Sequence, residues 1–140
     1  MAILLNHFSN PIDEHPDISI GVKFPLNKVN FFKNTTTTKE QVRTNLLNLL
    51  LTEPGERPFQ PNYGIGLASE LFKQEGGAPG ENAFSVADIK QRVNTGIQTY
   101  VPEISLIDVE GVFIEHQHKL MIKITYKFNL DGTLDAIAVS

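Results

Sequence analysis

The 140-residue sequence predicts an α+β fold, in which a small mixed or antiparallel sheet with a C-terminal β-meander packs with two main helices and one short helix. Two observations predict this fold. Apolar residues recur at helical spacing in the middle of the chain, and beyond Pro102 they recur at every second position. We expect an N-terminal arm with a short strand over residues 1–34 and a single α+β domain over residues 35–140.

The arm holds one stretch with alternating apolar residues, from Ile18 to Phe24, which predicts a short strand. Pro16 and Pro25 flank this stretch. Because turn-forming residues surround it, we expect the strand to lie at a sheet edge or to pair with a neighbouring chain.

The first helix is expected to start where Thr38 and Gln41 have the spacing of a capping box. An apolar stripe at helical spacing follows, formed by Val42, Leu46, Leu49 and Leu50. Proline and glycine at positions 54 and 55 end the pattern, so the helix should stop within residues 52–55.

Two further helices are predicted before Pro102. Residues 67–72 can form a short amphipathic helix, and residues 74–82 should be a mobile connection because they hold three glycines and a proline before the next helix. Ser85 and Asp88 then have N-terminal capping spacing, which starts a helix that ends near Tyr100. Its apolar stripe consists of Val86, Ile89, Val93 and Ile97.

The last third of the chain predicts strands. Three segments are predicted as consecutive strands, at residues 104–109, 111–115 and 120–128. A fourth segment, at residues 134–139, could supply a final edge strand or a tail. The segment His116-Gln117-His118 is the expected hairpin tip, and residues 130–133 predict a turn before the last segment.

Composition excludes several classes of function. A net charge of -4 and a pI near 5.5 argue against binding nucleic acid, which requires basic side chains to neutralise phosphates. The absence of cysteine removes disulfides, thiolate zinc sites and cysteine nucleophiles. No apolar stretch approaches the length that crosses a bilayer, and the N-terminus lacks the features of a signal peptide, so we expect a soluble protein.

Candidate catalytic and metal-binding residues are weak. His116 and His118 alternate near a strand end, but no third ligand is suggested by spacing, so we expect no metal and no other cofactor. Glu56 could be paired with Asp88 or Glu103 as in a glycosidase, yet nothing marks two of these carboxylates as buried and opposed. The sequence therefore predicts a protein without enzymatic activity.

The least ordinary segment is 55–66, in which prolines and glycines surround two aromatic residues. Phe59 and Tyr63 are either plugs that fold this loop onto the domain or anchors offered to a partner. Arg57 is either a hydrogen-bond donor that holds the loop together or an interface residue.

The string from Leu49 to Leu67, LLLTEPGERPFQPNYGIGL, resembles the signature of the GPW-like baseplate wedge family. That family includes the sheath initiators of contractile phage tails and the TssE component of type VI secretion. Its members have a leucine-rich helix, then a glycine, a small or acidic residue, Arg-Pro-Phe, one residue, a proline and an aromatic-Gly pair. The resemblance covers residues 17–128.

The resemblance implies a structural baseplate protein that initiates the sheath by docking on the wedge core and templating the first sheath ring through β-strand addition. It implies six copies in a ring in the virion tail baseplate, assembled in the host cytoplasm. The implied partners are wedge core proteins and the sheath protein, with tube or tail-hub proteins as further candidates, but no nucleic acid and no direct membrane contact. Some family members carry a lysozyme label, so a tail-associated peptidoglycan hydrolase is the alternative.

The sequence departs from the family at one position that matters for docking. Where the family has Glu-Pro-Arg, associated with docking on the core bundle, this chain has Val101-Pro102-Glu103 after Tyr100. The proline is kept and neither charge is in place. The residues expected to bind partners are Glu56, Arg57, Pro58, Phe59, Tyr63, Tyr100, Pro102, Glu103, Ile122, Ile124 and Tyr126.

Overall fold

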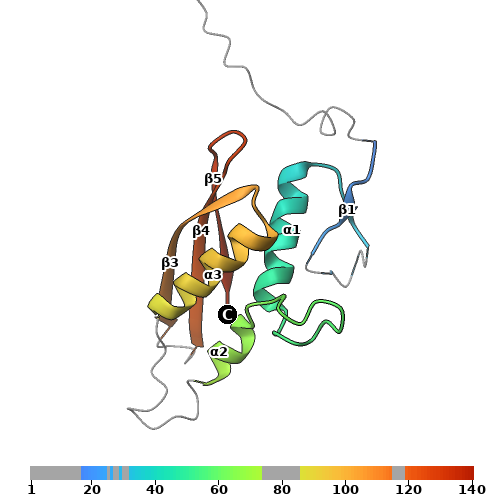
Figure 1. Cartoon of the computed structure of the whole chain (residues 1–140). Helices are drawn as coiled ribbons and strands as arrows, with labels where there is room; N and C mark the ends of the chain where they lie inside the picture. Colours follow the sequence, from blue (N-terminus) through green and yellow to red (C-terminus); the bar gives the residue numbers. More distant parts are fainter. Residues whose placement is uncertain (1–16, 25, 27–28, 30–31, 74–85, 115–118) are drawn as a thin grey trace, which may run out of the picture.

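The computed structural model describes residues 17–24, 26, 29, 32–73, 86–114 and 119–140. The predicted α+β class is confirmed, with three helices and two antiparallel sheets in these residues (Figure 1). The elements are β1 (Gly21–Val22), β2 (Asn34–Thr35), α1 (Thr38–Leu51), α2 (Leu67–Lys73), α3 (Val86–Tyr100), β3 (Ile104–Ile114), β4 (Lys119–Phe128) and β5 (Leu134–Val139).

The arm strand is shorter than the alternating pattern predicted. β1 pairs antiparallel with β2 in a two-stranded sheet beside α1, so its partner belongs to the same chain. The boundary between the expected arm and domain, residues 34–35, falls within β2. The division of the chain at that point stays a prediction.

Helix α1 begins one residue earlier than the predicted capping box. The N-cap is Thr37, whose hydroxyl accepts the Glu40 N–H at 3.3 Å. The observed pair, Thr37 and Glu40, has the same spacing as the predicted pair, Thr38 and Gln41. Gln41 instead accepts a hydrogen bond from the buried Thr35 hydroxyl at 2.7 Å, which joins α1 to β2. The predicted apolar stripe is confirmed, because its four residues are buried.

The remaining helices lie where the periodicity placed them, at residues 67–73 and 86–100. Ile89, Val93 and Ile97 of α3 are buried. The predicted cap at Ser85, the connection at 74–82 and the hairpin tip at 116–118 lie outside the described residues. None of the helices in the described part of the chain has the length and apolar character needed to span a bilayer.

The main sheet has three strands in the order β3-β4-β5. The two segments predicted at 104–109 and 111–115 form one strand, β3, which pairs with β4 along its length and shifts register between Leu106 and Asp108. The single extra residue there is a β-bulge, so one strand bends instead of ending. The segment at 134–139 is confirmed as an edge strand, β5, paired to β4.

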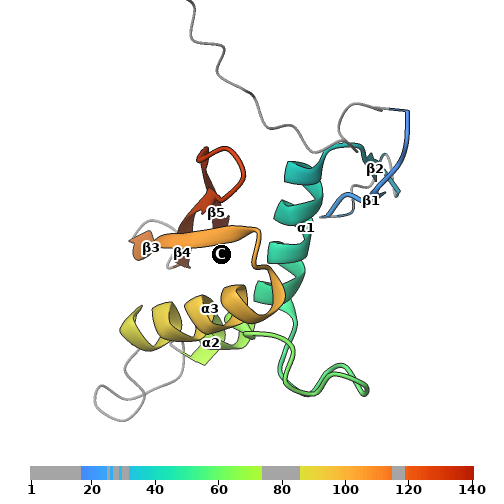
Figure 2. The ribbon, with the colours of Figure 1, turned by 45° about the horizontal axis from the view of Figure 1, so that its top comes forward.

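The core lies between one face of this sheet and the helices. Helix α3 crosses the sheet and α1 stands beside it (Figures 1 and 2). Alternate residues of β4 point into the core while Lys123 and Lys127 lie on the outer face, as expected for an antiparallel sheet with one solvated side. The core residues contributed by β4 are Ile122, Ile124, Tyr126 and Phe128.

Candidate functional site

The loop that joins α1 to α2 is held in one conformation by its own backbone. Gly55 N–H donates to the Pro61 carbonyl at 2.9 Å, and Tyr63 N–H donates to the Gln60 carbonyl at 3.0 Å. At its base, Ile65 N–H donates to the Leu49 carbonyl at 3.0 Å. The segment that resembles the family signature is therefore an ordered loop anchored to the end of α1.

Two glycines in this loop stand where a side chain would collide. Gly64 has φ +113, and a Cβ there would lie 2.3 Å from the Thr52 carbonyl oxygen. Gly66 has φ +69, and its Cβ would meet the Glu53 carboxylate, which accepts hydrogen bonds from the Ser69 backbone N–H and hydroxyl. Positive φ angles and close neighbours thus favour glycine both at Gly64, in the aromatic-Gly pair of the signature, and at Gly66.

Arg57, Tyr63 and Tyr100 form a stack that joins the loop to α3. The Arg57 guanidinium lies 3.9 Å from the centre of the Tyr63 ring, and that ring meets Tyr100 edge-on at 4.9 Å. Burial raises the pKa of Tyr63, and Arg57 opposes this shift. Tyr63 is 9% exposed, so its ring packs the loop against the domain, which is the first of the two alternatives for this residue.

Phe59 takes the opposite position. Its side chain is 97% exposed, and its neighbours Arg57 and Pro58 are also exposed. Phe59 therefore does not pack the loop against the domain, and its side chain projects from the loop into solvent. Glu56, likewise exposed, accepts the Glu53 N–H at 3.1 Å and so helps to close the loop.

The stack ends next to the corner between α3 and β3, where Val101-Pro102-Glu103 lies. Val101 is buried, whereas Pro102 and Glu103 are exposed. Asn129 holds this corner, because its side chain donates to the Pro102 carbonyl and its backbone N–H to the Glu103 carbonyl, both at 3.0 Å. The structure therefore brings the two predicted docking segments together through the contact of Tyr63 with Tyr100.

Arg57→Ala should lower the free energy of unfolding by about 0.5–1 kcal/mol, the size of a cation-π contact at an exposed site. It should also raise the pKa of Tyr63, because the guanidinium is the group that lowers it. Urea unfolding and ultraviolet titration of the tyrosines measure the two effects. A loss above about 2 kcal/mol would instead assign Arg57 the main role in holding the loop.

The expected role of three sheet residues needs correction. Ile122, Ile124 and Tyr126 were predicted to bind a partner, but all three are 0% exposed and belong to the central strand β4, which is paired on both sides. Their side chains form the core in this fold. Backbone groups of the sheet are open to another chain only along the outer edges of β3 and β5.

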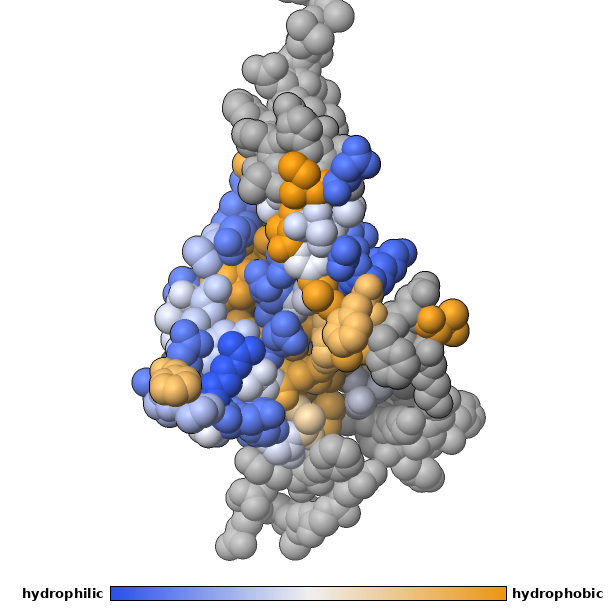
Figure 3. Space-filling model, turned by 90° about the vertical axis from the view of Figure 1, so that its right-hand side faces the viewer, coloured by the Kyte–Doolittle hydropathy of each residue, from blue (hydrophilic) through white to orange (hydrophobic). Residues whose placement is uncertain are grey.

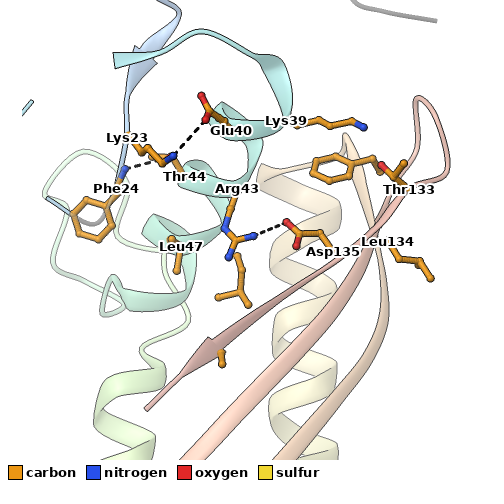
Figure 4. Close-up of a pocket in the computed structure, with 13 residues that line it drawn as sticks. Lys23, Phe24, Lys39, Glu40, Arg43, Thr44, Leu47, Thr133, Leu134 and Asp135 are labelled. Atoms are coloured by element: carbon orange, nitrogen blue, oxygen red, sulfur yellow. Dashed lines mark hydrogen bonds and ion pairs between the residues drawn. The ribbon is translucent and has the colours of Figure 1, made fainter. Parts of the chain in front are cut away.

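A groove that sequence reasoning did not find lies between α1 and the edge of β5. It has a volume of about 800 Å³, and Arg43 reaches across it from α1 to Asp135 of β5 at 2.7 Å (Figure 4). Its lining is contributed by the arm, α1, β5 and the turn before it: Lys23, Phe24, Lys39, Glu40, Arg43, Thr44, Leu47, Phe128, Thr133, Leu134, Asp135, Ile137 and Ala138.

Asp135 is the centre of a network at this groove. Its carboxylate accepts hydrogen bonds from the buried Tyr126 hydroxyl at 2.7 Å, from Arg43 at 2.7 Å and from the Ala136 N–H at 2.8 Å. Partial burial acts to raise the pKa of Asp135, but these three donors together hold it below its usual value. Burial and the same carboxylate raise the pKa of Tyr126 far above its usual value.

No carboxylate in the described ranges has the environment of a glycosidase acid. Such an acid needs burial and a raised pKa, whereas none of these Asp and Glu residues is buried, and the pKa values of Asp108, Asp131 and Asp135 are lowered. A cluster of three metal-ligating side chains is also missing from the described residues, and all four histidines lie outside them.

A comparison with known protein families identifies the family of this chain. A family model described as "Baseplate wedge protein gp25" matches residues 36–133. The chain belongs to the baseplate wedge protein gp25 family. The resemblance drawn from residues 49–67 is confirmed, and the ordered loop, the stack and the α3-β3 corner all lie within the matched region.

Individual relatives of this gp25-family chain are distant. Baseplate wedge protein gp25 of Enterobacteria phage T4 is 24% identical over 85 residues, and the match spans 61% of this chain and 60% of the T4 protein. A protein of Geobacter sulfurreducens described as a tail lysozyme has a TM-score of 0.58 and 21% identity, covering 74% of this chain and 89% of that one.

A chain in the six-fold symmetrised baseplate of the anti-feeding prophage has a TM-score of 0.56 and 24% identity, covering 80% of this chain and 85% of that one. At these identities the two solved structures establish the shared fold. They transfer no residue role to the gp25-family chain described here.

Proposed function

We propose that this chain is a structural baseplate wedge protein of a contractile tail that acts as its sheath initiator, and that a strand of the sheath protein adds to the edge of β5. Membership of the gp25 family supports the baseplate role. The observation that carries the finer role is the groove beside β5, where an extended segment would gain both backbone pairing and apolar contacts.

The backbone of β5 presents its open hydrogen-bonding groups to this groove. Phe128 N–H donates to the Thr133 carbonyl, which makes this a hydrogen-bonded pair. From this register, the backbone N–H and C=O groups of odd-numbered residues of β5 bond to β4, and those of even-numbered residues face the open edge. Leu134, Ala136 and Ala138 are therefore the positions that would pair with an added strand, once the Ala136 N–H is released from the Asp135 carboxylate that accepts it at 2.8 Å.

The other edge of the sheet is less suited to strand addition. The bulge between Leu106 and Asp108 interrupts the ladder of β3, and bulges of this kind block edge pairing. β5 has no register shift over its six residues. The regular edge with an adjoining groove is the better template.

In the proposed assembly, six such chains form a ring in the virion baseplate, built in the host cytoplasm. Each binds wedge core proteins through the surface that includes Tyr100, Pro102 and Glu103 and offers its β5 edge to the first sheath ring. The six-fold symmetrised baseplate in which a similar fold occurs supports this arrangement.

Ala138→Pro tests the strand addition. Proline removes an N–H that points away from β4, so the β4-β5 ladder should survive while pairing with a new strand is blocked. In particles produced from the complete gene cluster, we expect baseplates with tubes but at least tenfold fewer sheathed tails by negative-stain electron microscopy.

Ala138→Ser is the matched control, because it keeps the N–H and should sheath normally. Circular dichroism of both purified variants checks that the fold is retained. Normal sheath formation on folded Ala138→Pro would reject β5 as the template.

The hydrolase alternative predicts clearing of purified peptidoglycan by the wild-type protein. We expect none, because the described carboxylates lack the burial that a general acid requires. Clearing that a single Asp or Glu substitution abolishes would replace the structural proposal with the enzymatic one.

A further inference from the structure

Phe59 is the most exposed of the large apolar side chains in the described part of the chain, at 97%. A phenyl ring displayed to water in this way has no stabilising contact within its own domain. Aromatic side chains, phenylalanine included, are enriched in protein interfaces, and a few buried anchor residues carry most of the binding energy there.

The loop that carries Phe59 is already ordered without a partner. Pro58 and Pro61 restrict the backbone on both sides, and Gln60 N–H donates to the Arg57 carbonyl at 3.1 Å across the turn that includes Phe59. A preorganised loop loses little conformational entropy on binding, so more of the contact energy appears as affinity.

Arg57 adds a charge beside the ring. Its guanidinium rests on Tyr63, and no carboxylate among the described residues lies within ion-pair distance of it. An exposed, fixed guanidinium next to an exposed phenyl fits a partner that offers an apolar pocket with a carboxylate at its rim. With Glu56 adjacent, the loop lacks the basic excess that attracts anionic lipid.

This surface is separate from the groove beside β5. The groove takes Lys39, Arg43 and Leu47 from α1, and no residue of the loop lines it. The loop begins beyond Leu51, at the C-terminal end of that helix. Figure 3 shows the side of the molecule that carries α1 and the loop, where apolar patches alternate with polar ones. A partner at the loop and a strand at β5 can therefore bind the same copy.

We propose that Phe59 is the anchor by which this chain binds a different baseplate subunit, one with a preformed apolar pocket and a carboxylate at its rim that pairs with Arg57. The proposal rests on the baseplate role proposed above. It assigns the loop at the C-terminal end of α1 to the wedge side of the protein, and it leaves the β5 edge to the sheath.

The test is the incorporation of full-length variants into particles produced from the complete gene cluster. The amount of this chain per purified baseplate is measured by quantitative mass spectrometry against the tube protein. We expect Phe59→Ala to reduce it about tenfold or more, and Arg57→Glu to reduce it as well. Phe32→Ala, which removes a phenyl that is 75% exposed in the arm, is the matched control and should incorporate normally.

Cryo-electron microscopy of the wild-type particle gives an independent readout. Density for Phe59 within an apolar pocket of another subunit type is the expected result. Phe59 facing solvent, Phe59 seated on a second copy of this chain, or normal incorporation of Phe59→Ala would each overturn the proposal. If wild-type particles contain the chain in none of their baseplates, the proposed function itself fails, an outcome distinct from failure of the anchor alone.

Discussion

Gly64→Ala is expected to lower the free energy of unfolding by about 3 kcal/mol or more, a large fraction of the stability of a typical domain. The added Cβ would lie 2.3 Å from the Thr52 carbonyl oxygen, and φ +113 is unfavourable for alanine. The obstacle is backbone at the end of α1, which cannot rotate away as a side chain can. Urea unfolding followed by circular dichroism measures the loss.

Gly55→Ala is the control for this prediction. Gly55 also has a positive φ, +88, but nothing lies within 4 Å of the position of its Cβ. This variant should lose only the backbone strain, about 1–2 kcal/mol. If the two variants were equally stable, the close approach at Gly64 would not determine the loop conformation.

Asp135→Ala should have the second largest effect, a loss of about 2 kcal/mol in the free energy of unfolding. It removes the acceptor of the buried Tyr126 hydroxyl and leaves that group without its partner, which costs more than a hydrogen bond is worth on average. Tyr126→Phe in the same background should restore part of the loss. Asp108→Ala is the control, since both groups of the Asp108-Lys90 pair are exposed and its loss should be much smaller.

The same carboxylate predicts a dependence on pH. Its pKa in the folded protein lies below the usual 3.8, so its contribution to stability is complete above that pH and is lost as the pH falls through the lower folded value. Asp135→Asn should therefore flatten the decline of stability below pH 4. Unfolding midpoints measured between pH 2 and pH 6 would reveal it. A decline identical to that of the wild type would mean that other carboxylates account for it.

Periodicity was enough to predict the helices and most strands, because burial of one face imposes it directly. The predicted start of α1 was wrong by one residue, because two candidate N-caps were equivalent in sequence. Thr37 with Glu40 and Thr38 with Gln41 both have capping-box spacing, and only the bond from Thr35 to Gln41 in the folded chain separates them. The predicted break in β3 fell at Glu110, where pairing with β4 is continuous, whereas the one irregularity of this strand is the bulge between Leu106 and Asp108.

The candidate site was predictable only in part, for a physical reason. Alternating apolar residues on β4 satisfy a core and an interface equally, so the sequence could not indicate that Ile122 and Ile124 are buried. Phe59 and Tyr63 are separated by four positions and have opposite environments, which depends on the turn between them. The pair of Arg43 with Asp135 joins positions 92 residues apart and has no local signal.

Both edge strands of the main sheet carry an aspartate that occupies a backbone donor of its own strand. Asp135 accepts the Ala136 N–H on β5, and Asp108 accepts the Val109 N–H on β3, each at 2.8–2.9 Å. Two free copies that met edge to edge would have to displace a carboxylate from this N–H, so spontaneous pairing through these edges is disfavoured. In the proposed assembly, a sheath strand would therefore add to β5 only if its contacts in the groove outweigh the hydrogen bond that Asp135 gives up at the Ala136 N–H.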